Sequence, residues 1–422
     1  MPFVYGKIEE ITIIKIFQGI IMQQHVIRLA ATCLDCQDPS CRPGCPVNTP
    51  IPDMIRLFLD GEIKQAGQLL FENNPLSIVC SLVCPHEKHC EGHCVLNKKL
   101  SPVNVGEIEN YISSRYMDDI KFNKPEHNGH NIAIIGSGPA GIALAFIMAQ
   151  RGYGVTMYDA HDKIGGVLRY GIPDFRLDKT ILDNLVEKLK ALGVKIRPNT
   201  FIGKNINICD LQRDGFEAIF IGTGVWSPKK LDIKGESLGH VHFAIDYLKN
   251  PSVYDLGKKV IVLGAGNVAM DVARTAIKNG AEEVRIMYRR GKKDMPASYH
   301  EVQCAKLDGV KFDFYRIPEE ITEEGIKFKY NTDQVEEEDG FESADSVLVA
   351  VSQNPRDIIV KNNSQIDTDE RGLVITDETG QTTRNGVFAS GDVVTGARTV
   401  VEAVAFSKKV ADAMEKYIAQ KA

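Results

Sequence analysis

One pattern constrains the fold more than any other, and it occurs twice in the 422-residue chain. In each copy a short apolar run, residues 131–135 or residues 260–263, leads into a glycine-rich turn and then into residues with helical spacing. The turns are residues 136–141 (GSGPAG) and residues 264–269 (GAGNVA). Glycines between a strand and a helix let the backbone approach a pyrophosphate at the helix N-terminus. The repeated pattern therefore predicts an α/β chain with two Rossmann-like dinucleotide-binding domains.

The two copies differ at the end of the strand that follows the glycine-rich turn. In the first copy this strand ends at Asp159, whose carboxylate suits a ribose hydroxyl, and FAD is the expected ligand. In the second copy it ends at Arg289 and Arg290, followed by Lys292 and Lys293. This basic end suits the 2′-phosphate of NADPH. A solvated basic turn with no phosphate role is the alternative, and it would leave NADH as the electron donor.

A third segment, near the C-terminus, is expected to complete the flavin site. Residues 386–392 (GVFASGD) read as a short strand that ends in Gly-Asp, and a helical run begins at Thr399. We expect Asp392 to bind the ribitol, and the helix N-terminus to face the flavin N1/O2 edge, where charge accumulates on reduction. The flavin domain is thus predicted to be split by the nicotinamide domain. The predicted ranges are 129–252 for its first part, 253–351 for the NAD(P)H-binding domain and 352–422 for its second part.

The predicted nucleotide contacts are mainly backbone groups and small side chains. For FAD they are Gly136, Gly138, Pro139, Ala140, Gly141, Asp159, Gly165, Gly166, Arg176, Gly224, Gly391, Asp392 and Thr399. For NADPH they are Gly264, Gly266, Asn267, Val268, Ala269, Arg289 and Arg290. No side chain is assigned a chemical step, because the hydride passes from one cofactor to the other.

The cysteines are unevenly distributed, since eight of the ten fall between residues 33 and 94. They form two groups, namely Cys33, Cys36, Cys41 and Cys45, then Cys80, Cys84, Cys90 and Cys94. The first group, with Pro46 behind it, is a C-x2-C-x4-C-x3-C-P run, close to the bacterial ferredoxin pattern, which has x2 in its middle. In an intracellular chain such spacing indicates metal sites rather than disulfides.

Zinc and iron–sulfur clusters are the two candidates for these thiols. Four thiolates can close a structural zinc site, but zinc ribbons use paired C-x2-C knuckles. A compact run that ends in Cys-Pro suits a [4Fe-4S] cluster, whose irons take thiolates from several directions. We therefore predict two [4Fe-4S] clusters in a small helical domain over residues 22–128, with helices at residues 51–59 and 62–71. The clusters are expected to contribute much of the folding free energy of this domain.

The two remaining cysteines, Cys209 and Cys304, stand alone and far apart in the sequence. They are therefore not the cysteine pair of a disulfide reductase, and both are interpreted as buried apolar side chains. Electrons would leave the flavin through the N-terminal clusters.

Charge and hydropathy exclude other classes of protein. The net charge of −6 and the pI near 6.0 give no basic surface for nucleic acid. Residues 11–21 are apolar enough to imitate a signal peptide, but Lys15 and Gln18 interrupt the run. No stretch reaches the ~18 uncharged apolar residues of a membrane helix, so a cytoplasmic protein is expected. Met22 is an alternative start, and a helix that docks on a partner is the other interpretation of the residues before it.

Together these motifs resemble the small (beta) subunit of NADPH-dependent glutamate synthase and its relatives, among them the flavin-binding subunit or region of dihydropyrimidine dehydrogenase. The resemblance extends from about Met22 to the end of the chain. Its most specific stretches are residues 33–46, 84–94, 171–177, 264–271 and 288–290. The departures are modest, since Asp159 stands where flavin folds more often have Glu, and Ala269 replaces the third glycine.

The resemblance implies an interleaved set of cluster ligands. One cluster would be bound by Cys33, Cys36, Cys41 and Cys94, and the other by Cys45, Cys84, Cys90 and Glu109. On this assignment Cys80 is not a ligand. The resemblance also implies an electron-input subunit that passes electrons from NADPH through FAD and the clusters to a separate catalytic subunit.

Glutamate synthase is the expected destination of these electrons. The chain shows no flavin-mononucleotide barrel, and no cysteine at position 2 or 23 that could be a glutaminase nucleophile. An input subunit of dihydropyrimidine dehydrogenase, and a ferredoxin:NADP or sulfide oxidoreductase subunit, are the alternatives. A nicotinamide-sensing module without turnover is the alternative from a different class.

Overall fold

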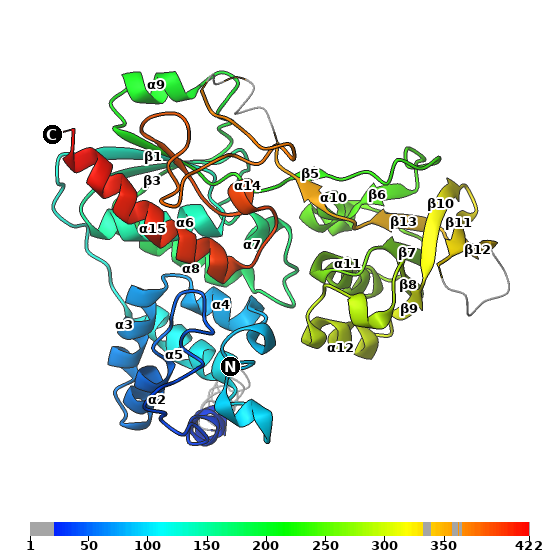
Figure 1. Ribbon diagram of the computed structural model, residues 1–422, viewed down its shortest axis with the longest axis horizontal. Helices are drawn as coiled ribbons and strands as arrows, with labels where there is room; N and C mark the ends of the chain where they lie inside the picture. The colour runs from blue at the N-terminus through cyan, green and yellow to red at the C-terminus, as the bar shows by residue number, and fades with distance from the viewer. Residues whose placement is uncertain (1–20, 332–338, 357–361, 363–364, 422) are drawn as a thin grey trace, which may run out of the picture. The chain divides into compact units, whose positions relative to one another are not determined.

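The computed structural model describes residues 21–331, 339–356, 362 and 365–421. The predictions made for residues 1–20 lie outside the described residues. The chain divides into two compact units, one up to Lys121 and one from Phe122 onward. Figure 1 shows a helical first unit and a second unit that contains the sheets. Among the described residues, no helix is long and apolar enough to cross a membrane.

The described part of the first unit is helical, as predicted. After a helix that includes residues 21–30, its elements are α2 (Ile51–Leu59), α3 (Ile63–Asn73), α4 (Ser77–Val83), two 3-10 turns (His86–Lys88 and Val95–Lys98) and α5 (Val105–Asp119). Helix α2 buries Met54, Ile55 and Phe58 on one face. Each such side chain contributes about 1.5–3 kcal/mol when it is fully buried. Helix α3 ends at Asn73 because Pro75 forces Asn74 out of the helical region, to φ −147° and ψ 101°.

Helix α5 lies at the centre of this unit. Its N-terminus is capped by Asn104, whose side-chain oxygen accepts a hydrogen bond from the Glu107 backbone amide at 3.1 Å. Ile108 and Ile112 on its inner face have no exposed surface. Helix α3 approaches α5 closely at Gly67, where a Cβ atom would lie 2.3 Å from the Cβ of Tyr116. A larger residue at Gly67 would therefore push the two helices apart.

The first sheet of the second unit has five parallel strands in the order β15-β4-β1-β2-β3. Its strands are β1 (Asn131–Ile135), β2 (Gly154–Tyr158), β3 (Lys195–Arg197), β4 (Ala218–Ile221) and β15 (Val387–Ala389). The last strand comes from the C-terminal segment and pairs with β4 in the register Val387↔Ile219. The flavin domain is therefore split, as predicted.

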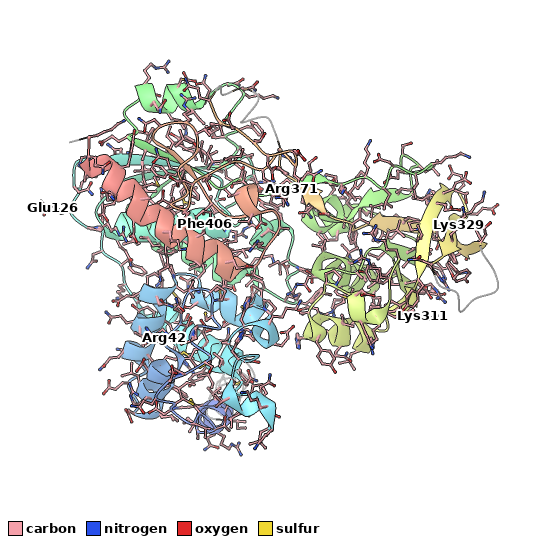
Figure 2. The ribbon with its side chains drawn as sticks, in the orientation of Figure 1. Arg42, Glu126, Lys311, Lys329, Arg371 and Phe406 are labelled. Atoms are coloured by element: carbon pink, nitrogen blue, oxygen red, sulfur yellow. The ribbon has the colours of Figure 1, made fainter. Side chains whose placement is uncertain are left out.

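Helices cover this sheet. They are α6 (Pro139–Gln150), α7 (Val167–Tyr170), α8 (Lys179–Ala191), α9 (Ile208–Arg213), α14 (Asp392–Thr395) and α15 (Val400–Ala419). Nine of the twelve residues of α6 are buried, so it is apolar on nearly every side. This burial follows from its position between β1 and α15, which both pack against it. Phe406, labelled in Figure 2, lies on α15.

The second sheet repeats the architecture, with five parallel strands in the order β6-β13-β7-β8-β9. Its strands are β6 (Val241–Phe243), β7 (Lys259–Leu263), β8 (Glu283–Tyr288), β9 (Lys311–Phe314) and β13 (Ser346–Val349). Its helices are α10 (Ala244–Lys249), α11 (Asn267–Lys278) and α12 (Tyr299–Leu307), with 3-10 turns at Pro251–Val253 and Lys292–Asp294.

A small antiparallel sheet lies between β9 and β13 in the sequence. It consists of β10 (Arg316–Thr322), β11 (Gly325–Tyr330) and β12 (Asp339–Ser343). Ile321, Ile326 and Phe328 of this sheet pack on one face of the five-stranded sheet. Its other face carries surface ion pairs such as Lys329 Nζ to Glu319 Oε1 at 2.6 Å, and Figure 2 labels Lys329 there.

The chain passes between the two five-stranded sheets along paired connections. Strand β5 (Ser227–Pro228) leads away from the flavin sheet, β14 (Gln353–Asn354) returns to it, and the two pair antiparallel. A nucleotide domain inserted into a split flavin domain is thus the observed fold. The boundaries at residues 129, 253 and 352 stay predictions.

Candidate cofactor sites

The flavin-side loop depends on glycines for steric reasons. Gly136 has a φ of +97°, and a Cβ atom there would lie 2.5 Å from the Gly222 carbonyl oxygen. A Cβ at Gly141 would lie 2.1 Å from the Gly136 carbonyl oxygen. Gly166, with a φ of +52°, belongs to a second loop that contacts Gly138, since its Cβ would lie 2.7 Å from the Gly138 Cα. The two loops therefore form one cradle of backbone groups at the N-terminus of α6.

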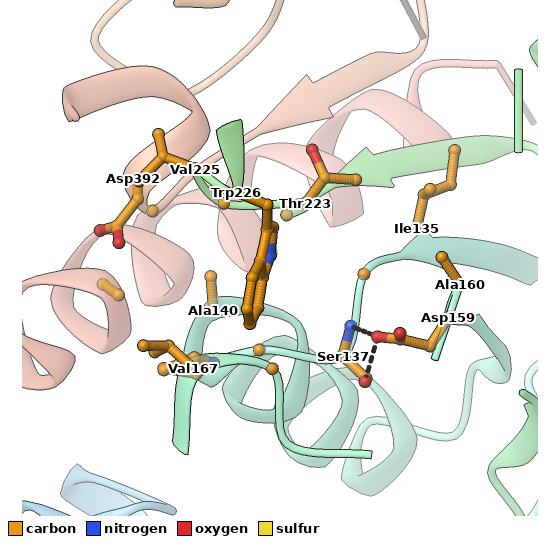
Figure 3. A pocket seen from close by; sticks show the side chains of 18 of the residues that line it. Ile135, Ser137, Ala140, Asp159, Ala160, Val167, Thr223, Val225, Trp226 and Asp392 are labelled. Atoms are coloured by element: carbon orange, nitrogen blue, oxygen red, sulfur yellow. Dashed lines mark hydrogen bonds between the residues drawn. The ribbon is translucent and has the colours of Figure 1, made fainter. Parts of the chain in front are cut away.

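This cradle opens into a cavity (Figure 3). Its lining extends from Asp159 past the glycine-rich turn to Asp392 and Thr399, which is the arrangement expected for a dinucleotide. The cavity brings together ten of the thirteen residues predicted to contact FAD. They are Gly136, Gly138, Pro139, Ala140, Asp159, Gly166, Gly224, Gly391, Asp392 and Thr399.

Three predicted FAD contacts do not line the cavity. Gly141 packs behind the loop, as its approach to the Gly136 carbonyl requires. Gly165 lies beside the cradle, and its backbone amide donates to the Ser137 carbonyl at 3.1 Å. The Arg176 side chain instead contacts Asp271 and Glu301 of the nucleotide domain.

Asp159 is buried and held by four donors or potential donors. Its Oδ2 accepts from the Ser137 backbone amide at 2.8 Å and from the Ser137 hydroxyl. Its Oδ1 accepts from the His161 amide at 2.8 Å and lies 3.0 Å from His161 Nδ1. Burial alone would raise the pKa of Asp159, but the bonds from His161 and Ser137 outweigh it and lower this pKa. The carboxylate is therefore charged, and it fixes the loop that carries Ser137 (Figure 3).

The opposite end of the cavity is formed by the C-terminal segment. Burial raises the pKa of Asp392 to about 6, and the Arg398 amide donates to its Oδ1 at 3.1 Å. Thr399 and Glu402 form a capping box that starts α15. Thr399, Val400 and Ala403 line the cavity, so the N-terminus of this 20-residue helix adjoins it. Its dipole favours negative charge at that end.

The aromatic side chains of this cavity were not predicted from the sequence. Trp226, the only tryptophan of the chain, lies in the cavity (Figure 3). Its ring centroid lies 5.1 Å from that of His161, which stacks on Tyr170 at 4.6 Å. These residues follow strands β4 and β2 in segments without a repeated pattern. The single tryptophan after the Thr223–Gly224 turn was the available signal.

In the glycine-rich loop of the nucleotide domain, neighbouring backbone likewise leaves no room for a Cβ atom at the first glycine. Gly264 has a φ of +128°, and a Cβ there would lie 2.3 Å from the Ala350 carbonyl oxygen. Gly266 precedes α11, where Val268 is half-buried. Ala269 has no exposed surface, so an alanine fits where a third glycine is more usual. Asn267 is fixed because its Oδ1 accepts from the Ser298 amide at 2.9 Å.

The end of β8 carries the exposed arginines of the second motif. The carbonyl of Arg289 accepts from Asn331 Nδ2 at 2.9 Å, and that of Arg290 from the Tyr315 amide at 3.3 Å. Both side chains are exposed, and neither guanidinium pairs with another residue in the part of the chain that the structure describes. Arg285 in the same strand instead pairs with Glu283 and other carboxylates. The positive charges at the end of β8 are therefore accessible to a ligand.

In the first unit, three cysteines of the first group share one cavity with the distant Cys94. Apart from the thiols, this cavity is walled mainly by apolar groups. The four are Cys33, Cys36, Cys41 and Cys94, the set that the family resemblance implies for one cluster. Burial and the neighbouring Cys94 and Cys33 raise the pKa of the Cys41 thiol to about 11. Four thiolates here would need the positive charge that a bound metal supplies.

The remaining predicted ligands form a second group around α5. Cys45, Cys84 and Cys90 lie near Glu109, which is 6% exposed. Burial is the sole cause that raises the pKa of Glu109 to about 8.

Cys80 belongs to the same group. It is buried on α4, and its Sγ accepts from Asn74 Nδ2 at 3.3 Å. Burial, followed by repulsion from Cys80 and the other acidic groups, raises the pKa of Cys84. The structure thus brings Cys80 as well as Glu109 close to the three cysteines.

The spacing of these thiols bears on the choice of metal. A zinc ion needs four ligands within about 2.3 Å of one point. Among the described residues, no group of three or more His, Cys, Asp or Glu side chains converges in this way. In an iron–sulfur cubane each thiolate binds a different iron, so the sulfurs stand farther apart. The preference for clusters therefore rests on the C-x2-C-x4-C-x3-C-P spacing of the first cysteine group.

The prediction that Cys209 and Cys304 are buried apolar side chains is wrong. Cys209 is exposed on α9, where Arg384 Nη2 donates to its Sγ at 3.1 Å. Cys304 is half-buried on α12, 3.5 Å from His300 Nε2. Polar neighbours keep both thiols at or near the surface, and a lone cysteine in the sequence gives no sign of such neighbours.

The fold and these sites define an NAD(P)H-dependent flavoprotein oxidoreductase with an iron–sulfur domain. Residues 130–406 match the family model described as pyridine nucleotide-disulphide oxidoreductase. Residues 11–120 match the model described as dihydropyrimidine dehydrogenase domain II, 4Fe-4S cluster.

Relatives among characterised proteins cover nearly the whole chain. The glutamate synthase [NADPH] small chain of Escherichia coli is 31% identical over 98% of this chain and 95% of its own length. That of Azospirillum brasilense is 33% identical over 93% of this chain and 89% of its own length. The chain therefore belongs to the glutamate synthase small chain family. It combines FAD- and NAD(P)H-binding domains with a 4Fe-4S domain.

Solved structures agree on the fold of the second unit. Mycobacterium tuberculosis FprA in complex with NADPH has a TM-score of 0.60 at 19% identity, over 69% of this chain and 85% of that chain. Thioredoxin reductase from T. acidophilum has a TM-score of 0.56 at 22% identity, over 69% of this chain and all of that chain. At these identities the likeness concerns the fold alone.

Proposed function

We propose that the chain is the electron-input subunit of a glutamate synthase. On this proposal it takes a hydride from NADPH onto FAD and delivers the electrons singly, through two [4Fe-4S] clusters, to a separate catalytic subunit. FAD, when bound, supplies the change from two-electron to one-electron chemistry.

The observation that carries the proposal is the cavity lined by Cys33, Cys36, Cys41 and Cys94 in a chain with two nested dinucleotide folds. A disulfide reductase of the same fold needs a redox cysteine pair. From residue 122 onward the sequence has only Cys209 and Cys304. Cys209 lies on α9 of the flavin domain and Cys304 on α12 of the nucleotide domain. The N-terminal thiols are therefore the available exit for electrons.

The residues of the flavin cavity have complementary tasks in this proposal. The backbone of Gly136 and Gly138 at the N-terminus of α6 would bind the pyrophosphate. Asp159 keeps this loop in place and would face the adenosine ribose. The N-terminus of α15, which begins after Thr399, would stabilise negative charge on the reduced flavin. The apolar walls and Trp226 would exclude water.

The exposed arginines support NADPH as the donor. Arg289 and Arg290 lie at the end of the second strand after the glycine-rich turn, where the nucleotide ribose binds in such folds. A 2′-phosphate there would make charge-assisted hydrogen bonds to their planar guanidinium groups.

We assign Glu109 as the fourth ligand of the second cluster, beside Cys45, Cys84 and Cys90. Burial of a carboxyl group at 6% exposure is unfavourable unless it is paired or binds a metal. Iron would supply that partner. The family resemblance leaves Cys80 outside the ligand set, and its buried thiol accepts a hydrogen bond from Asn74.

Sequence identity alone does not select the partner. The NADP(+)-dependent formate dehydrogenase subunit beta of Moorella thermoacetica is 32% identical, no less than the glutamate synthase chain of Escherichia coli. The extent of the match supports glutamate synthase instead. It covers 95% of the Escherichia coli small chain but 60% of the Moorella subunit.

Two experiments test the proposal. Anaerobically purified protein should contain one FAD and about eight irons, on the basis of two four-iron clusters. Zinc without iron in protein made under iron-replete, oxygen-free conditions would exclude the clusters. The partner should co-purify from the source cell and convert glutamine plus 2-oxoglutarate with NADPH. Turnover of a pyrimidine instead would assign the chain to dihydropyrimidine dehydrogenase, and the absence of NADPH:dye activity would indicate a sensing module.

A further inference from the structure

Arg176 joins the flavin domain to the nucleotide domain through a buried ion cluster. It lies between α7 and α8, and its Nη1 contacts Asp271 Oδ1 at 2.9 Å and Oδ2 at 2.7 Å. Its Nε lies 2.9 Å from Glu301 Oε1. The side chains of Arg176, Asp271 and Glu301 are 10%, 4% and 8% exposed. One guanidinium thus bridges carboxylates of α11 and α12.

Further contacts extend this cluster within the nucleotide domain. Glu301 Oε2 also pairs with Arg274 Nη1 at 3.1 Å, and Arg274 Nε pairs with Asp308 Oδ2 at 2.7 Å. The Arg274 guanidinium lies 4.5 Å from the ring centroid of Phe175, the residue before Arg176. Lys278 Nζ lies 5.0 Å from the same ring. Residues 175 and 176 therefore both contact side chains of α11.

Buried ion pairs add little stability over well-packed apolar residues of similar size, because the charges must be desolvated. What they add is positional, since one planar guanidinium must place Nη1 at Asp271 and Nε beside Glu301 at the same time. The cluster therefore fixes an orientation more effectively than it raises stability.

The position of Asp271 gives this orientation a functional meaning. Asp271 lies on α11, one turn after the residues Asn267 to Ala269 that begin the helix beside the glycine-rich turn. A constraint on Asp271 therefore constrains the helix that faces the nucleotide. The chain connections between the two sheets, by contrast, are the short paired strands β5 and β14. Pairs of short connections of this kind allow hinge motion between domains.

We propose that Arg176 is a positioning residue for hydride transfer, which holds α11 so that the nicotinamide meets the flavin ring. Hydride transfer requires the two rings in near-contact, and a misplacement of about 1 Å can slow such a step about 100-fold. Arg176 does not line the flavin cavity, so its effect on the reaction passes through Asp271 and Glu301.

The test is anaerobic stopped-flow reduction of bound FAD by NADPH in the full-length holoprotein. Arg176→Met keeps the length of the side chain and removes its charge and fork. We expect its FAD content and its Kd for NADPH to stay within about threefold of wild type, while the limiting rate of reduction falls at least tenfold. Arg176→Lys, which keeps the charge without the fork, should fall between the two.

A second readout is independent of activity. Hydrogen exchange of the backbone amides in α11 and in residues 171–178 should speed up in Arg176→Met, because the contact between them is lost. Asp271→Asn is the second variant, in case Arg176→Met fails to fold. The variant that combines both substitutions should be no slower than the slower single variant, since both remove the same contact.

Arg285→Met is the matched control. Arg285 also sits in an ion network, with Glu283, Asp313 and Glu342, but entirely inside the nucleotide domain. It should lower the melting temperature without changing the limiting rate of reduction.

Three results would overturn the proposal. Loss of FAD from Arg176→Met would mean that Arg176 supports the flavin site directly. A higher Kd for NADPH with an unchanged limiting rate would assign it to nucleotide binding. Wild-type reduction rates in folded Arg176→Met or Asp271→Asn would leave the cluster without a role in the reaction.

Discussion

The nucleotide sites of the second unit and the cysteine sites of the first are built in opposite ways. Each nucleotide site is mainly backbone, because one glycine with positive φ, Gly136 or Gly264, and a helix N-terminus follow one another within six residues. The cavity of Cys33 and Cys94, by contrast, is mainly side chains from distant positions. A backbone site stands on a hydrogen-bonded strand and helix whether or not its ligand is bound. A side-chain site of several thiols depends on the metal that neutralises them.

Removal of iron should break this comparison most visibly. A ferrous chelator applied under reducing, anaerobic conditions should release the iron and leave the FAD bound. We expect the amides of α2 to α5 to lose protection from hydrogen exchange, because metal binding contributes folding free energy to small domains. The amides of β1, β4 and β7 should keep theirs. Undiminished protection in α2 to α5 would mean that the apolar core around Ile108 and Ile112 suffices for the first unit.

The second prediction concerns the second cysteine group, where a carboxylate rather than a thiolate is assigned as the fourth ligand. Glu109→Ala should lose or degrade the cluster of Cys45, Cys84 and Cys90, which roughly halves the cluster iron if two four-iron clusters are present. Reduction of FAD by NADPH should survive, whereas transfer to the partner should fail. Iron analysis and electron paramagnetic resonance of the reduced protein measure the loss.

Cys80→Ser is the matched control for Glu109→Ala, because both residues are buried beside Cys84. It should keep the full iron content. If Cys80→Ser loses a cluster and Glu109→Ala does not, the assignment is inverted and Cys80 is the fourth ligand. Glu109→Gln should retain some iron, since an amide oxygen remains in place, and the potential of that cluster should shift because ligand identity sets it.

The contrast between local backbone sites and contacts of distant side chains also explains which features of the fold and the sites the sequence predicts. The strand, turn and helix of each nucleotide motif are local, so residues 131–135 are a strand as predicted. The ion cluster of Arg176 is not local, since Asp271 follows it by 95 residues, and no pattern relates the two. Ser137 and His161 were missed for a similar reason, because their partner Asp159 was expected to face a ribose alone. The exposed thiol of Cys209 contacts Arg384, which lies 175 residues further along the sequence.

A smaller effect is expected at the basic end of β8, where side chains select between nucleotides that the backbone binds equally. Arg289→Ala combined with Arg290→Ala should raise the KM for NADPH and leave that for NADH nearly unchanged. Hydrogen bonds to a charged phosphate contribute about 1.5–3 kcal/mol each. Steady-state kinetics with both donors measure the change. Equal losses with both would indicate damage to folding, and a wild type without preference would remove the phosphate assignment.

The smallest effect separates the two tasks of glycine within one backbone site. Gly136 has a φ of +97° and no room for a Cβ atom. Gly138 has a φ of −72°, and a Cβ atom there would lie 4.0 Å from its nearest neighbour, the Gly222 carbonyl oxygen. Gly136→Ala should therefore strain the turn itself, at about 1–3 kcal/mol. Gly138→Ala should leave the turn intact and obstruct the approach of the pyrophosphate.

Thermal unfolding of the FAD-free protein and titration with FAD distinguish these tasks. Gly136→Ala should lower the melting temperature of the FAD-free protein, while Gly138→Ala should leave it unchanged and weaken FAD binding. Both residues lie in the same turn, and both substitutions replace one Cα hydrogen atom with a methyl group. A difference in stability or FAD affinity between the two variants therefore separates backbone strain from contact with the ligand. If both variants lose stability equally without FAD, the loop depends on both glycines for its fold. The backbone site would then be as vulnerable to single substitutions as the thiol site.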